Sequence, residues 1–328
     1  AYTMLADSTD EYVVCLDASS GEEKWRVRAD STFVEEYGHG PRSTPTVNGD
    51  LLFALSSYGK LYALNAGSGE KLWQHDFVKE FGSTVPQWGF TTSPLVEGEQ
   101  LVVEVGGEGE QSIVSFAKDT GEVWWATHTD KAAFSSPIAI TSRGHRQLIF
   151  LTSENLVSVS PRDGRVFWSY PWLVHHGISV PTPIYVPDDR LFVSSSYDYG
   201  GALLQINAVG DGLAVEQRWK NRAMENHYSS SVLHGNYLYG FDDSILKCID
   251  ANTGAQQWAS RGPGKGSLIF ADGHLIVLGG EGKLVLAEAT SEEYREIASL
   301  QVFEDQSWTL PPYPAAGCMS ETTRRWSV

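Results

Sequence analysis

The sequence predicts an all-β fold of repeated four-stranded antiparallel units, and three observations carry that prediction. A Gly and a Trp recur four residues apart, pairs of short apolar strands recur between these motifs, and no segment shows a sustained helical period. The composition agrees, because 32 Gly and 11 Trp in 328 residues are typical of a turn-dense β-protein with bulky side chains between its sheets.

The Gly-Trp motif gives the length of the repeat. Its five regular copies are Gly21 with Trp25, Gly69 with Trp73, Gly121 with Trp125, Gly164 with Trp168, and Gly254 with Trp258. A sixth copy, ending at Trp219, carries an insertion, and a seventh has Ile297 in place of Trp. The mean interval of about 47 residues suits one four-stranded propeller blade, in which the Trp is expected to pack between neighbouring blades.

The segments between these motifs predict the remaining strands. Each holds a short apolar strand, a tight turn at Gly or Asp, and a second strand; the copies are 43–55, 92–105, 182–195, 230–241 and 266–279, with 136–152 as a version that has a longer turn. Gly49, Gly98, Gly235 and Gly273 supply the positive φ that two-residue hairpins need. Each blade is therefore expected to run from an inner strand to an outermost Trp strand.

The charge of the chain limits its partners. With 24 basic and 41 acidic residues the net charge is −17, and an acidic surface repels phosphate backbones, so nucleic acid is not an expected partner. Such a charge also keeps a large protein in solution. No run of 18 apolar residues occurs, so we predict no transmembrane helix.

The motif A-x-(T/S)-G-x-x-x-W, following an alternating strand, resembles the pyrroloquinoline-quinone (PQQ) propeller repeat over essentially the whole chain. That repeat is shared by quinoprotein alcohol dehydrogenases and by BamB-type outer-membrane assembly lipoproteins. Further matches resemble bacterial PQQ-binding-like or BamB-like propellers; they are GPRSTPTV (40–47), QWGFTTSPLV (87–96), NHYSSSVL (226–233), YLYGFDDSILKCID (237–250) and GKGSLIFADGHLIVL (264–278). The resemblance implies an eight-bladed propeller that is exported or periplasmic.

Of the eight blades implied, the chain holds about seven blades' worth. Residues 1–34 are expected to be the outer strands of a blade that lacks its inner strand, six complete blades follow, and residues after Trp308 begin another. In the alternative, the C-terminal inner strand completes the N-terminal blade and closes a ring of seven. Either way, residues 1–328 are expected to form a single propeller domain, a fragment of the family fold.

The resemblance also implies what a catalytic quinoprotein would need. In such enzymes PQQ is held by a calcium ion, a stacked Trp and a vicinal Cys-Cys disulfide. This chain has no adjacent Cys pair and no D-x-D-x-D loop, and Asp242-Asp243 is interpreted as a hairpin turn. The Gly-rich runs 106–110 and 279–283 are interpreted as hairpins, since no helix follows either. We therefore expect no catalytic residues, no metal site, no PQQ-dependent dehydrogenase activity and no cofactor, with PQQ left as the alternative.

One constellation of residues lies just before the inner strands, at the expected mouth of the central channel. It comprises His39, Arg42, Trp88, Phe90, Phe134, His175, His176, Asn226, His227, Tyr228, Lys265 and Trp308. Cationic and aromatic side chains around one axis suit a small anionic or planar ligand. We expect Arg42, Trp88, His227 and Lys265 to converge on one cavity; the alternative is that loop residues at a rim are polar and aromatic in any case.

Two classes of function remain. In the first, a non-catalytic propeller presents one face to protein partners, such as proteins of the cell envelope, as BamB does. In the second, a small-molecule or enzymatic site lies at the channel mouth. The missing quinoprotein apparatus favours the first class, and the basic and aromatic constellation favours the second.

The C-terminal tail departs from the repeat. After SWTLPP, residues 313–328 show neither the hairpin nor the second strand that the repeat requires. With permitted codons, the frame one base earlier can spell GGRLYVRDDEEVV, which restores a turn and a strand. We therefore expect a shift of reading frame near Tyr313, with a divergent tail as the alternative; the coding DNA decides between them.

Overall fold

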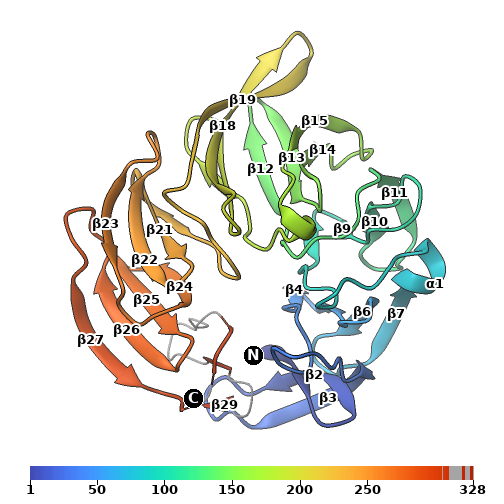
Figure 1. Ribbon diagram of the computed structural model, residues 1–328. Coiled ribbons are helices and arrows are strands. Elements are labelled where there is room, and N and C mark those ends of the chain that lie inside the picture. Colours follow the sequence, from blue (N-terminus) through green and yellow to red (C-terminus); the bar gives the residue numbers. More distant parts are fainter. Residues whose placement is uncertain (305, 310–319, 322–325, 328) are drawn as a thin grey trace. The chain divides into compact units, whose positions relative to one another are not determined.

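The computed structural model describes all residues except 305, 310–319, 322–325 and 328 (Figure 1). Its chain divides into two compact units, Ala1–Ser179 and Val180–Val328, and each is described by itself. Among the described residues the only helices are α1 (Phe77–Phe81) and the single 3-10 turn η1 (His175–Gly177). No helix in this part of the chain is long and apolar enough to cross a membrane.

Unit 1 consists of four antiparallel sheets in chain order. The first has three strands, β1 (Tyr2–Ala6), β2 (Asp10–Leu16) and β3 (Glu23–Ser31). The other three have four strands each: β4 (Thr46–Asn48), β5 (Leu51–Leu55), β6 (Lys60–Asn65) and β7 (Lys71–Asp76); β8 (Leu95–Glu97), β9 (Gln100–Glu104), β10 (Ile113–Ala117) and β11 (Val123–Thr127); β12 (Ile138–Ser142), β13 (His145–Leu151), β14 (Asn155–Val159) and β15 (Val166–Pro171).

Unit 2 repeats the same plan three times. Its four-stranded sheets are β16 (Ile184–Val186), β17 (Arg190–Ser195), β18 (Gly200–Val209) and β19 (Gly212–Asn221); β20 (Val232–His234), β21 (Tyr237–Asp242), β22 (Ile245–Asp250) and β23 (Gln256–Ser260); β24 (Gly266–Ala271), β25 (His274–Gly279), β26 (Lys283–Glu288) and β27 (Glu296–Gln301). A two-stranded ladder, β28 (Ser320–Glu321) with β29 (Trp326–Ser327), follows.

This topology confirms the predicted all-β propeller of four-stranded antiparallel blades. The N-terminal sheet has three described strands and six complete sheets follow it, as the repeat predicts. The choice between seven and eight blades in the closed ring stays a prediction, because the segment that bears on it, 310–319, lies outside the described residues. Most of the segment expected to be frame-shifted lies outside them too.

The repeated Trp packs between neighbouring sheets, as predicted. Its indole Nε1 donates to a backbone carbonyl of the next sheet, from Trp25 to Ala66 O (3.1 Å), from Trp73 to Lys118 O (2.9 Å) and from Trp125 to Pro161 O (3.1 Å) in unit 1. Trp219 and Trp258 make the same bond in unit 2, to Ala251 O and Thr290 O. Each bond satisfies a buried donor, which is why one Trp per blade can seal a sheet-to-sheet contact.

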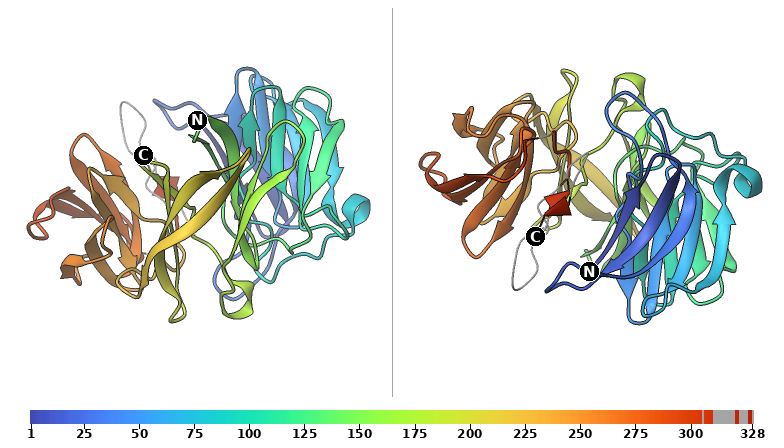
Figure 2. Two further views of the ribbon diagram at one scale, coloured as in Figure 1. Left: turned by 90° about the horizontal axis from the view of Figure 1, so that it is seen from above. Right: turned by 90° about the horizontal axis from the view of Figure 1, so that it is seen from below.

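Figure 2 shows the backbone of successive sheets side by side within each unit. Apolar clusters fill the space between such sheets. In unit 1, Phe53, Phe90 and Phe116 join the second and third sheets. In unit 2, Tyr239, Trp258 and Val277 join the last two. Because successive side chains of a strand point to opposite faces, each sheet contributes to two such clusters, and the loops at its ends are left to carry function.

Candidate functional site

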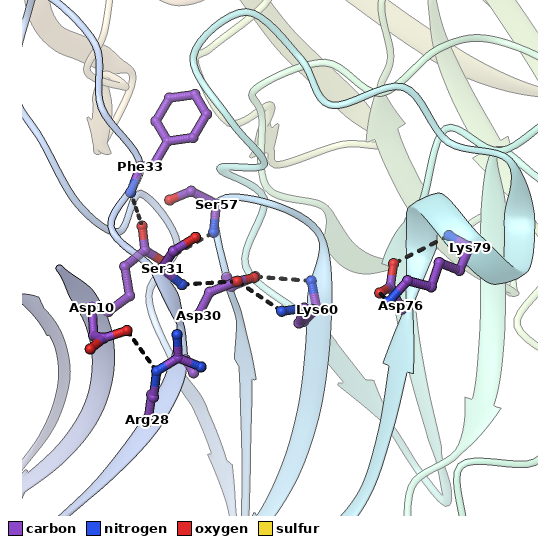
Figure 3. Close-up of polar contacts among 12 residues, drawn as sticks. Asp10, Arg28, Asp30, Ser31, Phe33, Ser57, Lys60, Asp76 and Lys79 are labelled. Carbon is purple, nitrogen blue, oxygen red and sulfur yellow. Dashed lines mark hydrogen bonds and ion pairs between the residues drawn. The ribbon is translucent and has the colours of Figure 1, made fainter.

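In two sheets of unit 1, a buried carboxylate fixes the start of the loop that leaves the last strand. Asp30, at the end of β3, accepts hydrogen bonds from the Ser56 hydroxyl (2.9 Å) and from Lys60 Nζ (2.8 Å) of the next sheet (Figure 3). Glu11 is fully buried and accepts from the backbone N–H groups of Phe33 (3.2 Å) and Ser57 (3.3 Å). Burial raises the pKa of the Glu11 carboxyl, although these hydrogen bonds oppose the shift.

A second copy of this arrangement occurs two sheets later, at the same distance from the motif Trp. Asp130, five residues after Trp125 as Asp30 is after Trp25, accepts from the Thr152 hydroxyl (2.6 Å) and from Asn155 Nδ2 (2.8 Å). Burial alone would raise the pKa of Asp130, but hydrogen bonds from His128, Thr152 and Asn155 outweigh it and hold that pKa at about 2. These hydrogen bonds therefore fix the first residue of the loop that begins at Asp130.

The predicted site residues of unit 1 fall into two groups. Arg42 pairs with the Glu35 carboxylate and donates to Gly38 O, while Nδ1 of the exposed His39 accepts from the backbone N–H of Glu35. These contacts brace the loop 32–45 from within. The half-buried Trp88 forms a tilted contact with Phe134, with 5.2 Å between ring centroids, and this contact joins the loops that precede β8 and β12.

Two further predicted positions behave differently. Phe90 is 1% exposed and packs on Phe77 with 5.5 Å between ring centroids, so it is a core residue and lines no opening. His175 is exposed on η1, and the side chain of His176, also on η1, lies outside the described residues.

In unit 2 the predicted residues form a continuous aromatic cluster. The Tyr197 hydroxyl lies 2.9 Å from His227 Nε2, the His227 and Tyr228 rings are 6.1 Å apart, and Tyr228 meets Trp308 edge-on at 4.8 Å. Both Nδ1 of His227 and Nε1 of Trp308 are buried without a hydrogen-bond partner among the described residues. Asn226, by contrast, is used structurally: it is 1% exposed and donates to Phe241 O.

Charges surround this aromatic cluster. Lys265 Nζ pairs with Asp243 at 2.6 Å and lies 5.6 Å from the centre of the Tyr228 ring. Burial, and then the positive charge of Lys265, lower the pKa of His227, while burial raises the pKa of Tyr228. At neutral pH the cluster therefore presents a neutral imidazole and a protonated phenol, which suit hydrogen bonding to an uncharged group.

A cavity of about 850 Å³ opens beside this cluster, lined by residues of unit 2 alone. Tyr228, Lys265 and Trp308 line it, so the structure brings these three predicted residues together. The expected convergence of Arg42 and Trp88 with His227 and Lys265 spans the two units and stays a prediction.

Sequence reasoning missed four charged residues of this cavity, which are Arg261, Glu281, Lys283 and Glu304. Glu281 belongs to the Gly-rich run 279–283, which is the β25–β26 turn, as predicted. The signal that would have found it is position: this turn faces the loop 261–265, and Gly280 N donates to Lys265 O at 2.6 Å. Turns at the same end of one blade meet, whatever their sequence.

Comparison with known proteins decides the family. Residues 9–260 match the family model described as outer membrane protein assembly factor BamB. The chain belongs to this family. Among solved structures, it is similar to BamB from Moraxella catarrhalis, with 13% identity, a TM-score of 0.68, and coverage of 98% of this chain and 90% of that one. The computationally designed Ika8 protein is also similar, with 10% identity, a TM-score of 0.52, and coverage of 89% and 96%. No curated protein matches.

The acidic residues of this BamB-family chain bear on whether it could hold a metal ion. Within the described part of the chain, no group of three or more His, Cys, Asp or Glu side chains lies close enough together to hold a metal ion. The adjacent acids Asp242 and Asp243 are each paired with a lysine, Lys247 and Lys265. What both units offer at their loop ends is aromatic surface and hydrogen-bonding groups.

Proposed function

We propose that this chain is a non-catalytic binding propeller that works in the cell envelope and docks a protein partner through the loops of unit 1. The observation that carries the proposal is an exposed apolar set on the connections between successive sheets. Val34 is 65% exposed, Tyr37 54%, Val78 41% and Leu173 60%. Apolar residues on anchored loops are typical of protein interaction sites, because they lose water on docking without first having to be ordered.

The anchoring argues for docking rather than for loose solvent-facing loops. Loop 32–45, which carries Val34 and Tyr37, is held at its root by Asp30 and Glu11 and braced inside by the Arg42–Glu35 pair. A pre-organised loop spends less binding free energy on ordering. The family description, outer membrane protein assembly factor, indicates the class of partner: an outer-membrane protein or a component of its assembly apparatus.

PQQ chemistry is not part of the proposal. The sequence has no adjacent Cys pair, and the described residues offer no acidic cluster for a calcium ion, so they do not fit the cofactor. We expect no dye reduction with alcohols or sugars after addition of PQQ and calcium, and turnover in that assay would contradict this expectation.

The docking proposal is tested by site-specific photocrosslinking in cells. A photoreactive residue at Tyr37 or Leu173 should crosslink to one envelope protein, identified by mass spectrometry. The matched control is Leu72, which is 45% exposed but lies on β7, a fourth strand. Equal crosslinking from Leu72, or none from the loop positions, would contradict the proposed surface.

A further inference from the structure

The cavity of unit 2 is lined by charges of both signs. The exposed side chains of Arg261, Glu281 and Glu304 have no ion pair within the described residues. Lys265 and Lys283, also in the lining, are paired with Asp243 and Glu296. An anionic ligand would meet the two unpaired carboxylates, and a cationic ligand would meet Arg261 and both lysines. The electrostatics therefore favour a neutral ligand over the anionic one expected from the sequence.

The hydrogen-bonding groups of the lining require a ligand that both donates and accepts. The Tyr228 hydroxyl, which can donate and accept, makes no hydrogen bond within the described residues. The Glu281 and Glu304 carboxylates accept only, whereas Arg261 donates only. Hydroxyl groups serve all of these at once, since each can donate and accept.

Backbone hydrogen bonds hold the loop after the last strand against the β25–β26 turn at the edge of the cavity. The Phe90 N–H donates to Ser57 O (2.9 Å) in unit 1, and the Ser307 N–H donates to Gly280 O (2.8 Å) at the equivalent turn of the last sheet. Gly264 lines the cavity, and a Cβ there would meet nothing within 4 Å, so a ligand ring can approach the backbone closely.

From these observations we propose that the unit 2 cavity binds a neutral saccharide. The Tyr228 hydroxyl donates to a sugar oxygen, Trp308 and Tyr228 present apolar ring surface, Glu281 and Glu304 accept from sugar hydroxyls, and Arg261 donates to sugar oxygens. A cavity of about 850 Å³ is within the usual range for small-molecule sites. This site goes beyond the docking of a protein and does not depend on it, because its residues all belong to unit 2 and the docking loops to unit 1.

The test uses three trisaccharide probes of similar size but different charge, measured by isothermal titration calorimetry. These are N-acetylglucosamine trimer, which is neutral; glucosamine trimer, which is cationic; and galacturonate trimer, which is anionic. The neutral trimer should bind the full chain and both charged trimers should bind more weakly. No binding of the neutral trimer at up to about 10 mM, or tighter binding of either charged trimer, overturns the proposal.

Variants locate the binding. Glu281→Gln, Glu304→Gln and Tyr228→Phe should each weaken binding of the neutral trimer by about tenfold, the effect of losing one hydrogen bond. Asp211→Asn, which removes an exposed charge from the β18–β19 turn of the same unit, should leave the affinity unchanged. Because the two Glu side chains are exposed and unpaired, these variants should fold as the parent does, and unaltered affinity in both would overturn the assignment.

Discussion

The indole of Trp73 lies directly over Gly121 of the following sheet: a Cβ placed on Gly121 would come within 2.9 Å of Trp73 Cδ2. The same contact joins Trp25 to Gly69 and Trp125 to Gly164. The Gly and the Trp that stand four residues apart in each motif thus serve different interfaces. Each Trp covers the Gly of the next copy, which is why the two residue types recur together.

Substitution of Gly121 tests this contact. Gly121→Ala should lower the free energy of unfolding by about 1–2 kcal/mol for its left-handed backbone and by about 1–3 kcal/mol more for the overlap with Trp73. Gly98→Ala, in the same sheet, is the control: its φ is +62° but a Cβ there meets nothing within 4 Å. Urea unfolding should show the larger loss for Gly121→Ala, and equal losses would contradict the stacking argument.

This relationship shows how far the sequence alone could go. The Gly-Trp spacing predicts the blade, its strands and the inter-sheet role of Trp, because local turn chemistry and one bulky residue per repeat determine them. It could not show that Phe90 is core, since a Phe in a loop has no periodic pattern that reveals its burial. Nor could it find Glu11 and Glu104, because an acidic residue in a strand is ordinarily solvent-facing.

The unit 2 cavity illustrates a second limit. Tyr228, Lys265 and Trp308 were found because their residue types stand out before inner strands, whereas Glu281 lies in a turn whose sequence predicts only a turn. The charge balance of the cavity depends on which acids face it, and that information is three-dimensional. The sequence therefore indicated an anionic or planar ligand from its cations and aromatic residues, whereas Glu281 and Glu304 enter the argument only through the structure.

Asp130 should contribute stability that depends on pH. Its folded pKa of about 2 lies below the ordinary value of 3.8, so the contribution is complete above pH 3.8 and is lost as the pH falls towards 2. Asp130→Asn should lower the free energy of unfolding by about 2 kcal/mol at pH 7. The difference in the free energy of unfolding between parent and variant should shrink when urea unfolding is measured at about pH 2.5. An equal difference at pH 7 and at about pH 2.5 would show that the Asp130 charge does not cause the loss of stability.

The pH dependence of stability that Glu104 contributes should have the opposite sign to that of Asp130. It is 1% exposed, and burial raises the pKa of its carboxyl well above the ordinary value, with the nearby Asp130 charge adding to the shift and a hydrogen bond from Ala133 N (3.2 Å) opposing it. The protonated form is therefore favoured in the folded chain, and stability is lost as the pH rises from the ordinary value towards the raised one.

Glu104→Gln keeps an acceptor for the Ala133 N–H but cannot ionise. Its free energy of unfolding should therefore match that of the parent near pH 4 and exceed it at pH 8. Glu122→Gln, an exposed acid of the same sheet, should follow the parent at both pH values. A parent chain that is more stable at pH 8 than the Glu104→Gln variant would mean that the ionised carboxylate is stabilising after all.

His227 offers a direct measurement of the electrostatics beside the cavity. Burial lowers its pKa first, the Lys265 charge lowers it further, and the Asp243 carboxylate opposes both effects. Because the neutral imidazole is favoured in the folded state, stability should decline as the pH falls through the ordinary value of 6.5. In an NMR titration, the His227 ring signal should give a pKa below 6.5.

Lys265→Gln should raise the pKa of His227, because it removes a positive charge and releases Asp243 from its ion pair. Lys283→Gln is the matched control, since Lys283 also lines the cavity but pairs with Glu296 and is not among the groups that shift His227. If both variants raise the pKa of His227 equally, that pKa reflects the overall electrostatic potential of the cavity, and a specific effect of Lys265 is refuted. If only Lys265→Gln moves it, Lys265 stands close enough to the His227–Tyr228 pair to set the protonation state that a hydroxyl-bearing ligand would meet.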